Sequence, residues 1–381
     1  MTIPPIDLTA EYHSIKTEID EAVHGVLESG DFINGPNVAA FEYEAAAYLG
    51  VGHAVGCGNG SDALLLALMA LGVGPGDRVV TTTQSFFATA GSIARLGATP
   101  VFADIDPRTF TLDPADLPRA EARAGGPVKA VIPVHLYGQC ADMDPILQYA
   151  HDRGWAVIED TAQAFGATYR GRQAGTMGDV GTFSFFPTKN LGCYGDGGMM
   201  TTGDDAIADR LRILRVHGAR RKYFSEVVGV NSRLDELQAA VLRVKLRHVD
   251  SWIAHKRSLA RTYDEGLREL PDFVQPPIEA AGNVHTYHQY VVRVRRGCRD
   301  GLQRHLADEG IASTVYYPQL LHLQQCFASL GYGAGDMPRA EQALGEILSL
   351  PLWSEMPSEQ ARVVVDAMGT YFGELPSGGC A

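Results

Sequence analysis

The sequence predicts an α/β fold in which helices cover both faces of a mostly parallel sheet. Short apolar runs alternate with helical patterns through the first two thirds of the 381 residues, and this alternation is typical of parallel strands joined by crossover helices. The chain is also longer than one average domain of about 150 residues. Because the regular alternation of apolar runs and helical patterns ends near residue 250, we expect a large α/β domain over 1–250 and a smaller α+β domain over 251–381.

The individual elements follow from apolar periodicity and from glycines that end helices. The predicted strands of the large domain are 77–83, 99–105, 128–134, 155–160 and 180–186, and the predicted helices between them are 61–72, 86–97 and 143–154. A further helix is expected over 231–249, where Ser232 and Asp235 are close to a capping box. In the smaller domain we expect a helix over 299–310, which lies between the segments 287–294 and 311–317. A loop over 271–283 precedes these three segments.

Composition excludes several classes of partner. The net charge of −13 at pH 7 argues against nucleic acid or an anionic membrane as the main partner. No signal-peptide pattern and no long uncharged apolar window is present, so we expect a cytoplasmic protein. The lack of C-x-x-C spacing favours a reducing compartment over a disulfide framework or a zinc site, and no metal is predicted. The cysteines are Cys57, Cys140, Cys193, Cys298, Cys326 and Cys380.

Lys189 is the single basic residue of the stretch "FSFFPTKNLGCYGDGGMM" (183–200). It follows a predicted buried strand and precedes a glycine-rich turn. Partial burial lowers the pKa of an amine and leaves it neutral and nucleophilic, which is what an imine-forming lysine requires. The alternative is a surface lysine on a glycine loop.

Asp160 ends the predicted strand over 155–160. A carboxylate in this place can keep a heteroaromatic nitrogen protonated, as pyridoxal phosphate requires if its ring is to accept electrons. The alternative is an N-cap for a helix that follows.

A phosphate site is indicated by "GCGNGSDALLLAL" (56–68), where glycines run into a helix start. A dinucleotide site fits less well, because the G-x-G-x-x-G spacing fails and Asp77, the acid about 20 residues on, falls in a turn. Phe86 and Phe87 follow another predicted strand, and one of them could stack on a planar cofactor ring; packing in the core is the alternative. All four features lie at carboxyl ends of strands, where parallel sheets bind ligands.

With these segments in place, the chain resembles the DegT/StrS-type sugar aminotransferases, which are pyridoxal phosphate enzymes of the aspartate-aminotransferase fold (fold type I). The resemblance covers nearly the whole chain. It runs through "GDFINGP" (30–36), "GNGSDAL" (58–64), "EDTAQAFGA" (159–167), "SFFPTKNLGCYGDGG" (184–198), "GVNSRLDELQAA" (229–240) and "YYP" (316–318).

The resemblance implies a role for each matching residue. Lys189 forms the imine with the cofactor, Asp160 holds the pyridine nitrogen, Gln163 contacts the phenolic oxygen and Phe86 stacks on the ring. The implied phosphate ligands are the backbone amides of Ser61 and Asp62, the hydroxyl of Ser184, and Asn231 from a second subunit. The implied contacts to a nucleotide sugar are Arg233, Tyr316 and Tyr317, largely from the second subunit. The enzyme is therefore expected to be a homodimer with composite active sites.

The implied reaction moves an amino group from L-glutamate to a keto carbon of a nucleotide-linked sugar, yielding an amino sugar for a surface polysaccharide or a glycosylated metabolite. Lysine rather than histidine at position 189 favours amino transfer over dehydration. The form "KNLGCYGDGG" resembles the branch that aminates C3, and "LYGQCAD" (136–142) makes a UDP-linked 3-keto-glucuronate the first substrate to consider, although Tyr316 replaces a histidine of those relatives. The alternatives are C4 amination of a 4-keto-6-deoxy nucleotide sugar, a non-catalytic regulator that binds the cofactor or a nucleotide sugar, and a disfavoured NAD-dependent oxidoreductase.

Overall fold

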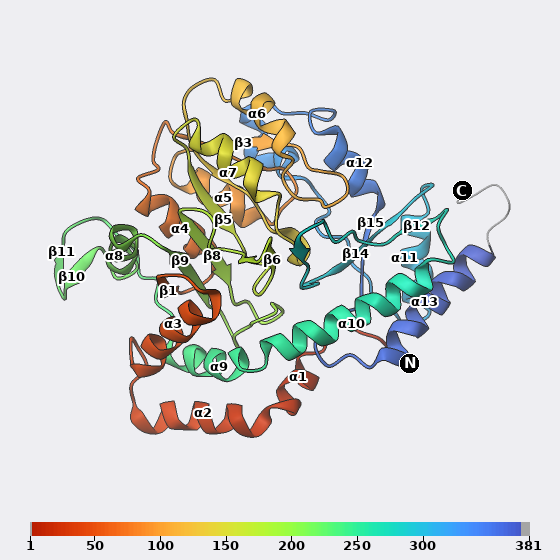
Figure 1. The fold of residues 1–381 in the computed structure, drawn as a ribbon, viewed down its shortest axis with the longest axis horizontal. Coiled ribbons are helices and arrows are strands. Elements are labelled where there is room, and N and C mark those ends of the chain that lie inside the picture. Colours follow the sequence, from red (N-terminus) through yellow and green to blue (C-terminus); the bar gives the residue numbers. More distant parts are fainter. Residues whose placement is uncertain (1, 375–381) are drawn as a thin grey trace.

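A seven-stranded sheet forms the centre of the computed structural model, which describes residues 2–374 (Figure 1). Its strand order is β1-β9-β8-β5-β4-β2-β3. Strand β9 runs antiparallel to β1 and β8, and the remaining neighbours pair in parallel, so the predicted mostly parallel sheet is confirmed. The strands are β1 (His53–Cys57), β2 (Arg78–Thr82), β3 (Thr99–Ala103), β4 (Val128–Ile132), β5 (Ala156–Asp160), β8 (Val180–Ser184) and β9 (Gly198–Thr202).

Helices cover both faces of this sheet (Figure 1). Successive residues of one strand enter different cores, for example Val79 and Val80 of β2, as the two-residue period of a strand requires. Helices α4, α5 and α8 complete one core, and α6 and α7 complete the other. The helices of the first 250 residues are α1 (Leu8–Ser14), α2 (Lys16–Ser29), α3 (Pro36–Leu49), α4 (Gly60–Ala70), α5 (Phe87–Arg95), α6 (Leu117–Arg123), α7 (Met143–His151), α8 (Asp205–Leu214) and α9 (Glu236–Leu246).

The start of α9 differs from the prediction. The helix begins at Glu236 rather than near residue 231, and the Asp235 side chain makes no capping hydrogen bond. The Ser232 hydroxyl instead donates to the Asp62 carboxylate at 2.8 Å and accepts from the Gly58 amide at 3.0 Å. The capping-box interpretation is therefore wrong, because Ser232 ties its segment to the beginning of α4.

The C-terminal part combines a small antiparallel sheet with long helices (Figure 1). Its strand order is β12-β14-β15, and α10 packs along α13. The predicted loop over 271–283 carries β12 and the first residue of β13, whereas 311–317 forms only isolated bridges, at Ile311 and Thr314. The elements are α10 (Val249–Leu267), β12 (Val274–Gln275), β14 (Tyr290–Val294), α11 (Arg299–Asp308), α12 (Pro338–Glu346), β15 (Ile347–Leu350) and α13 (Ser358–Gly373).

Short elements complete the structure. A three-stranded sheet contains β6 (Thr168–Tyr169), β7 (Arg172–Gln173) and β13 (Asn283–Val284), and a hairpin contains β10 (Ala219–Arg221) and β11 (Phe224–Ser225). The 3-10 turns are η1 (Pro114–Asp116), η2 (Leu136–Gly138), η3 (Leu321–Leu323) and η4 (Gln325–Leu330). Cys57, Cys140, Cys193 and Cys326 are free thiols, and Cys380 lies outside the described residues. Within residues 2–374, no helix is both long and apolar enough to cross a membrane.

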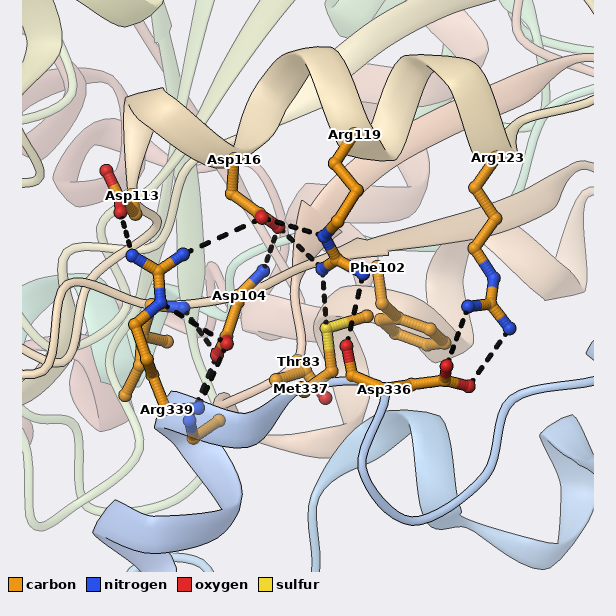
Figure 2. A network of polar contacts seen from close by, with 12 residues as sticks. Thr83, Phe102, Asp104, Asp113, Asp116, Arg119, Arg123, Asp336, Met337 and Arg339 are labelled. Atoms are coloured by element: carbon orange, nitrogen blue, oxygen red, sulfur yellow. Dashed lines mark hydrogen bonds and ion pairs between the residues drawn. The ribbon is translucent and has the colours of Figure 1, made fainter.

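A network of charged side chains fastens the start of α12 to the large sheet (Figure 2). The carboxylate of Asp104, which follows β3 and is buried, accepts from the backbone amides of Arg339 at 3.0 Å and Ala340 at 2.9 Å. Beside it, Arg123 pairs with Asp336 at 3.0 Å. Close by, the Leu321 amide donates to the Thr83 carbonyl at 2.9 Å. These contacts hold the chain that follows residues 316 and 317 against the carboxyl edge of the sheet.

Candidate active site

A cavity of about 450 Å³ opens where β2, β5 and β8 end and where α4 begins. Parallel sheets commonly bind ligands at this edge, and the volume is in the range of small-molecule sites. The structure brings together there most of the residues expected from the sequence. Those that line the cavity are Ser61, Phe86, Asp160, Gln163, Ser184, Lys189, Tyr316 and Tyr317.

Lys189 lies in the turn that follows β8, and its partly exposed side chain faces the cavity. Its backbone amide donates to the Phe186 carbonyl at 2.9 Å, which closes the turn. Burial lowers the pKa of Lys189 to about 8, against an opposing effect of the Asp160 carboxylate. The alternative of a surface lysine is wrong.

Asp160 ends β5 and is 4% exposed. Its carboxylate accepts from the Thr89 hydroxyl at 2.8 Å and from the Ala162 amide at 3.2 Å. Burial raises the pKa of Asp160, and these hydrogen bonds and the charge of Lys189 offset part of that effect. A carboxylate in this environment is stabilised by a cationic N–H donor placed in the cavity. The N-cap alternative is wrong, because turns rather than a helix follow Asp160.

An aromatic wall closes one part of the cavity. Phe86 precedes α5, is 56% exposed and lies 5.7 Å from the ring of Tyr317, measured between ring centroids. Phe87 is also exposed and stacks on Phe327. Packing in the core, the alternative for these two phenylalanines, is therefore wrong. The Gln163 side-chain amide donates to the Tyr317 hydroxyl at 2.7 Å and, through its oxygen, accepts from a backbone amide at 2.7 Å.

The N-terminus of α4 offers donors for an anion. Among the described residues, the amides of Gly60 and Ser61 have no hydrogen-bond acceptor, and the positive end of the helix dipole lies there. A Cβ at position 60 would lie 2.6 Å from the Cβ of Ser184, so only glycine lets β8 come this close. The Asp62 amide, by contrast, already donates to the Asn59 side chain at 2.8 Å. The expected role of Asp62 as a phosphate donor disagrees with this pairing, and Asp62 does not line the cavity.

Asn231 and Arg233 do not reach the cavity of their own subunit. Asn231 is exposed and Arg233 is partly buried. Between them, Ser232 is held by Gly58 and Asp62, on the side of the α4 start that does not line the cavity. Their expected roles toward a second subunit remain predictions.

A buried pair that the sequence did not reveal supports Asp160. His135 and Glu159, at the ends of neighbouring strands, are both fully buried, with Nε2 of His135 2.8 Å from the Glu159 carboxylate. Nδ1 of His135 accepts from the Ala141 amide at 3.1 Å, so Nε2 carries the proton and donates. Burial alone would raise the pKa of Glu159, but the hydrogen bonds from His135 and two glycine amides outweigh it, and the pKa is lowered. The pair fixes the end of β5 and so holds Asp160, the last residue of this strand, in place.

Other residues of the cavity also escaped the sequence analysis, because they are ordinary residues that the fold brings to the site. They are Asn59, Ser85, Thr89, Thr188, Asp196, His288 and Gln289. The Ser85 and Thr89 hydroxyls are 2.8 Å apart, and Thr89 in turn binds Asp160. Lys189 is the only lysine or arginine among the described residues that line the cavity, whereas Asp160 and Asp196 contribute carboxylates.

Comparisons with known proteins point to one family. Residues 13–369 match the model of the DegT/DnrJ/EryC1/StrS aminotransferase family, a pyridoxal-phosphate-dependent family. The chain is 51% identical to the "pleiotropic regulatory protein" of Geobacillus stearothermophilus, over 98% of this chain and 99% of that protein. It is 43% identical to the dTDP-3-amino-3,4,6-trideoxy-α-D-glucose transaminase of Streptomyces venezuelae, over 96% of this chain and 95% of that enzyme. It is 41% identical to the UDP-2-acetamido-2-deoxy-3-oxo-D-glucuronate aminotransferase of Pseudomonas aeruginosa, over 95% of this chain and 98% of that enzyme.

Solved structures agree with this result. DesV of S. venezuelae, solved in complex with a ketimine intermediate, superposes with a TM-score of 0.94 at 42% identity, over 98% of this chain and 100% of that one. NtdA of Bacillus subtilis, solved with bound PMP, gives a TM-score of 0.90 at 30% identity, over 98% and 86%. The predicted aminotransferase fold is confirmed, and the chain belongs to the DegT/DnrJ/EryC1/StrS aminotransferase family.

Proposed function

We propose that the chain is a pyridoxal-phosphate-dependent aminotransferase that transfers an amino group from L-glutamate to C3 of a nucleotide-linked keto sugar. One observation carries the proposal: a lysine amine with a pKa lowered to about 8 and a buried carboxylate line the same cavity. A helix N-terminus with free amides completes the cavity. These features supply an imine-forming amine, a partner for a pyridinium and a phosphate site.

The residues of the cavity fit the cofactor. When bound, pyridoxal phosphate supplies a reactive carbonyl and an electron-accepting ring. Asp160 would hold the proton on the ring nitrogen, which also offsets the cost of burying this carboxylate. The Ser61 amide and the Ser184 hydroxyl would hold the phosphate, and Phe86 would cover a ring face. Gln163 would turn its amide N–H from Tyr317 to the phenolic oxygen.

Lys189 has two tasks in this site. Its neutral amine would attack the carbonyl carbon that the cofactor supplies, and a lowered pKa raises the fraction of neutral amine at neutral pH. With an amine substrate in place, the same Nζ would act as the acid–base group that moves a proton between the substrate carbon and the cofactor carbon on the other side of the connecting nitrogen. Thr89 and Ser85 keep the Asp160 carboxylate in place while Lys189 moves the proton.

The charge of the cavity supports a composite site in a homodimer. Phosphate, sugar diphosphate and glutamate are all anionic, yet Lys189 is the only lysine or arginine lining the described part of the cavity. Arg233 and Asn231 of a second copy would supply the missing donors. The β10–β11 hairpin stands away from the body of the molecule (Figure 1). Its Tyr223 is 87% exposed, and the nearby Val228 is 88% exposed. Such exposed apolar groups favour burial against another chain.

Mixing two impaired variants tests the composite site. Asn231→Ala is expected to weaken cofactor retention about 10- to 100-fold, because a hydrogen bond to a charged phosphate contributes about 1.5–3 kcal/mol. Heterodimers of Asn231→Ala with Lys189→Ala should contain one site with both native residues and recover about half of the activity per dimer, measured after co-refolding. Heterodimers of Lys189→Ala with Asp160→Asn are the matched control. Lys189 and Asp160 line the cavity of the same subunit, so each site of this heterodimer carries one substitution and no activity should be recovered. Equal failure of both mixtures would mean that each subunit builds its own site.

The carbon that receives the amine is tested directly. The names of the Streptomyces and Pseudomonas relatives place the amine or the keto group at C3, and "KNLGCYGDGG" agrees with them. We expect that glutamate and matched 3-keto and 4-keto nucleotide sugars, with and without a carboxylate at C6, yield a product with the new C–N bond at C3 by NMR. A shift of one ring carbon misplaces the reacting atom by about a bond length, which costs roughly 100-fold in rate.

The outcomes separate the alternatives. Amination confined to C4 would overturn the C3 assignment and leave the aminotransferase intact. A protein that binds pyridoxal phosphate but whose visible absorption does not change with glutamate would be the non-catalytic regulator.

A further inference from the structure

Lys256 is a buried lysine to which the proposed function gives no role. It lies on α10 and is 6% exposed. Its Nζ donates to the side-chain oxygen of Asn190, the residue that directly follows Lys189. Asn190 is also 6% exposed. A helix that runs from the large sheet to α13 is thus joined to the turn that carries the reactive amine (Figure 1).

The surroundings of Lys256 do not explain its burial as an ion pair. Within residues 2–374 no carboxylate lies in ion-pair contact with Lys256. Glu11, the acid whose charge acts on Lys256, uses its oxygens for Lys245 at 2.7 Å and Ser354 at 3.0 Å. Burial lowers the pKa of Lys256 to about 8, with an opposing effect of Glu11. An unpaired buried amine is costly, so a purely structural position would favour an apolar residue.

Asn190 depends on this lysine. Its side-chain nitrogen has no hydrogen-bond partner among the described residues, so the bond from Lys256 is the one that holds the side chain. His288, which lines the cavity, lies near both amines: burial first, and then Lys189 and Lys256, lower its pKa well below the usual range. Lys256 therefore belongs to the shell directly behind Lys189.

We infer that Lys256 is a positioning residue for Lys189: by donating to Asn190, it fixes the turn from which the reactive amine reaches the cavity. The inference rests on the proposed function. Loss of the donor leaves a buried amide oxygen without a partner and loosens the turn. Because a displacement of about 1 Å can cost roughly 100-fold in rate, the effect should fall on the reaction of Lys189 rather than on substrate binding.

The test compares variants that keep or remove the donor. Lys256→Met keeps the length and loses the donor, whereas Lys256→Gln keeps a neutral donor. Lys245→Met is the matched control, because it also removes a buried lysine, from α9, whose Nζ donates to Glu11 and lies over the ring of Tyr194 rather than bonding to Asn190. The rate at which the cofactor-free protein and pyridoxal phosphate form the visible imine band is measured first. The values of kcat and KM and the melting temperature follow.

We expect Lys256→Met to slow imine formation and to lower kcat by about 10-fold or more, with KM within about twofold of the parent. Lys256→Gln should recover most of both rates. Lys245→Met should lower the melting temperature while its folded protein reacts at the parent rate. If Lys256→Met does not fold, Asn190→Ala must show the same slow imine formation.

Two results would overturn the inference alone. The first is imine formation at the parent rate in Lys256→Met, or in Asn190→Ala if Lys256→Met does not fold. The second is equal impairment of folded Lys256→Met and Lys256→Gln. Absence of the band in the parent chain would overturn the proposed function, and the inference with it. The two failures are therefore distinguishable in one set of spectra.

Discussion

Lys189→Ala is expected to abolish amino transfer, with kcat reduced by roughly 10⁴-fold or more, because nucleophilic and proton-transfer roles are lost together. The fold should survive, since no hydrogen bond of the Lys189 side chain is present among the described residues and only its attraction to Asp160 is lost. The melting temperature of the cofactor-free variant should stay within a few degrees of the parent. The measurements are steady-state kinetics with glutamate and the keto sugar, and thermal unfolding.

Lys129→Ala is the matched control. Lys129 lies at the beginning of β4, at the opposite edge of the sheet, where it pairs with Asp77 at 3.0 Å on a partly exposed surface. Its removal should leave kcat unchanged and reduce the free energy of unfolding by at most about 1 kcal/mol. Turnover by Lys189→Ala at the parent rate would remove Lys189 from the reaction.

Asp160→Asn is expected to retain pyridoxal phosphate but to lose about 100- to 10,000-fold in kcat. An amide cannot hold the proton of a pyridinium, whereas the phosphate contacts at α4 are unchanged. The range corresponds to about 3–5 kcal/mol of transition-state stabilisation. Equilibrium binding of the cofactor and single-turnover rates separate the two effects, and Asp77→Asn at the opposite edge is the control. A variant that transaminates at the parent rate would make Asp160 a purely structural residue.

The same substitution has a stability signature with a defined sign. The folded-state pKa of Asp160 is raised, so the carboxyl group binds its proton more tightly in the folded than in the unfolded protein. The free energy of unfolding then falls as the pH rises from the unfolded pKa through the raised folded pKa. In the cofactor-free protein, Asp160→Asn removes this decrease in the free energy of unfolding, because an amide does not titrate. Its melting temperature, relative to the parent, should therefore rise as the pH increases from acidic to neutral.

Periodicity predicted the sheet well because both of its faces are buried. The apolar runs over 77–83, 128–134 and 180–186 each contain an observed strand, and glycines mark the ends of the helices between them. Strand direction cannot be seen in this way. Strand β9, the one antiparallel member of the central sheet, carries the same buried pattern as its parallel neighbours.

The parts of the site that escaped prediction depend on contacts distant in sequence. His135 and Glu159 meet because β4 and β5 are neighbours in register, and neither residue stands out locally. Ser232 looked like a local cap, but the fold places Asp62 within 2.8 Å of it, and that contact wins. The sequence pattern predicts that the Asp62 amide binds phosphate, but this amide donates to the Asn59 side chain instead. Local patterns identified the reactive groups, and only the fold identified what supports them.

In the proposed function, Lys189 forms the imine with pyridoxal phosphate in this cavity. Reduction of the loaded protein with borohydride, followed by digestion and mass spectrometry, locates the modified lysine. Lys256 is an internal comparison in the same experiment, because burial lowers its pKa to about 8 as well, yet it does not line the cavity. We expect one phosphopyridoxyl group per chain, on Lys189. Modification of Lys256 or another lysine, or no modification of a protein that retains the cofactor, would contradict it.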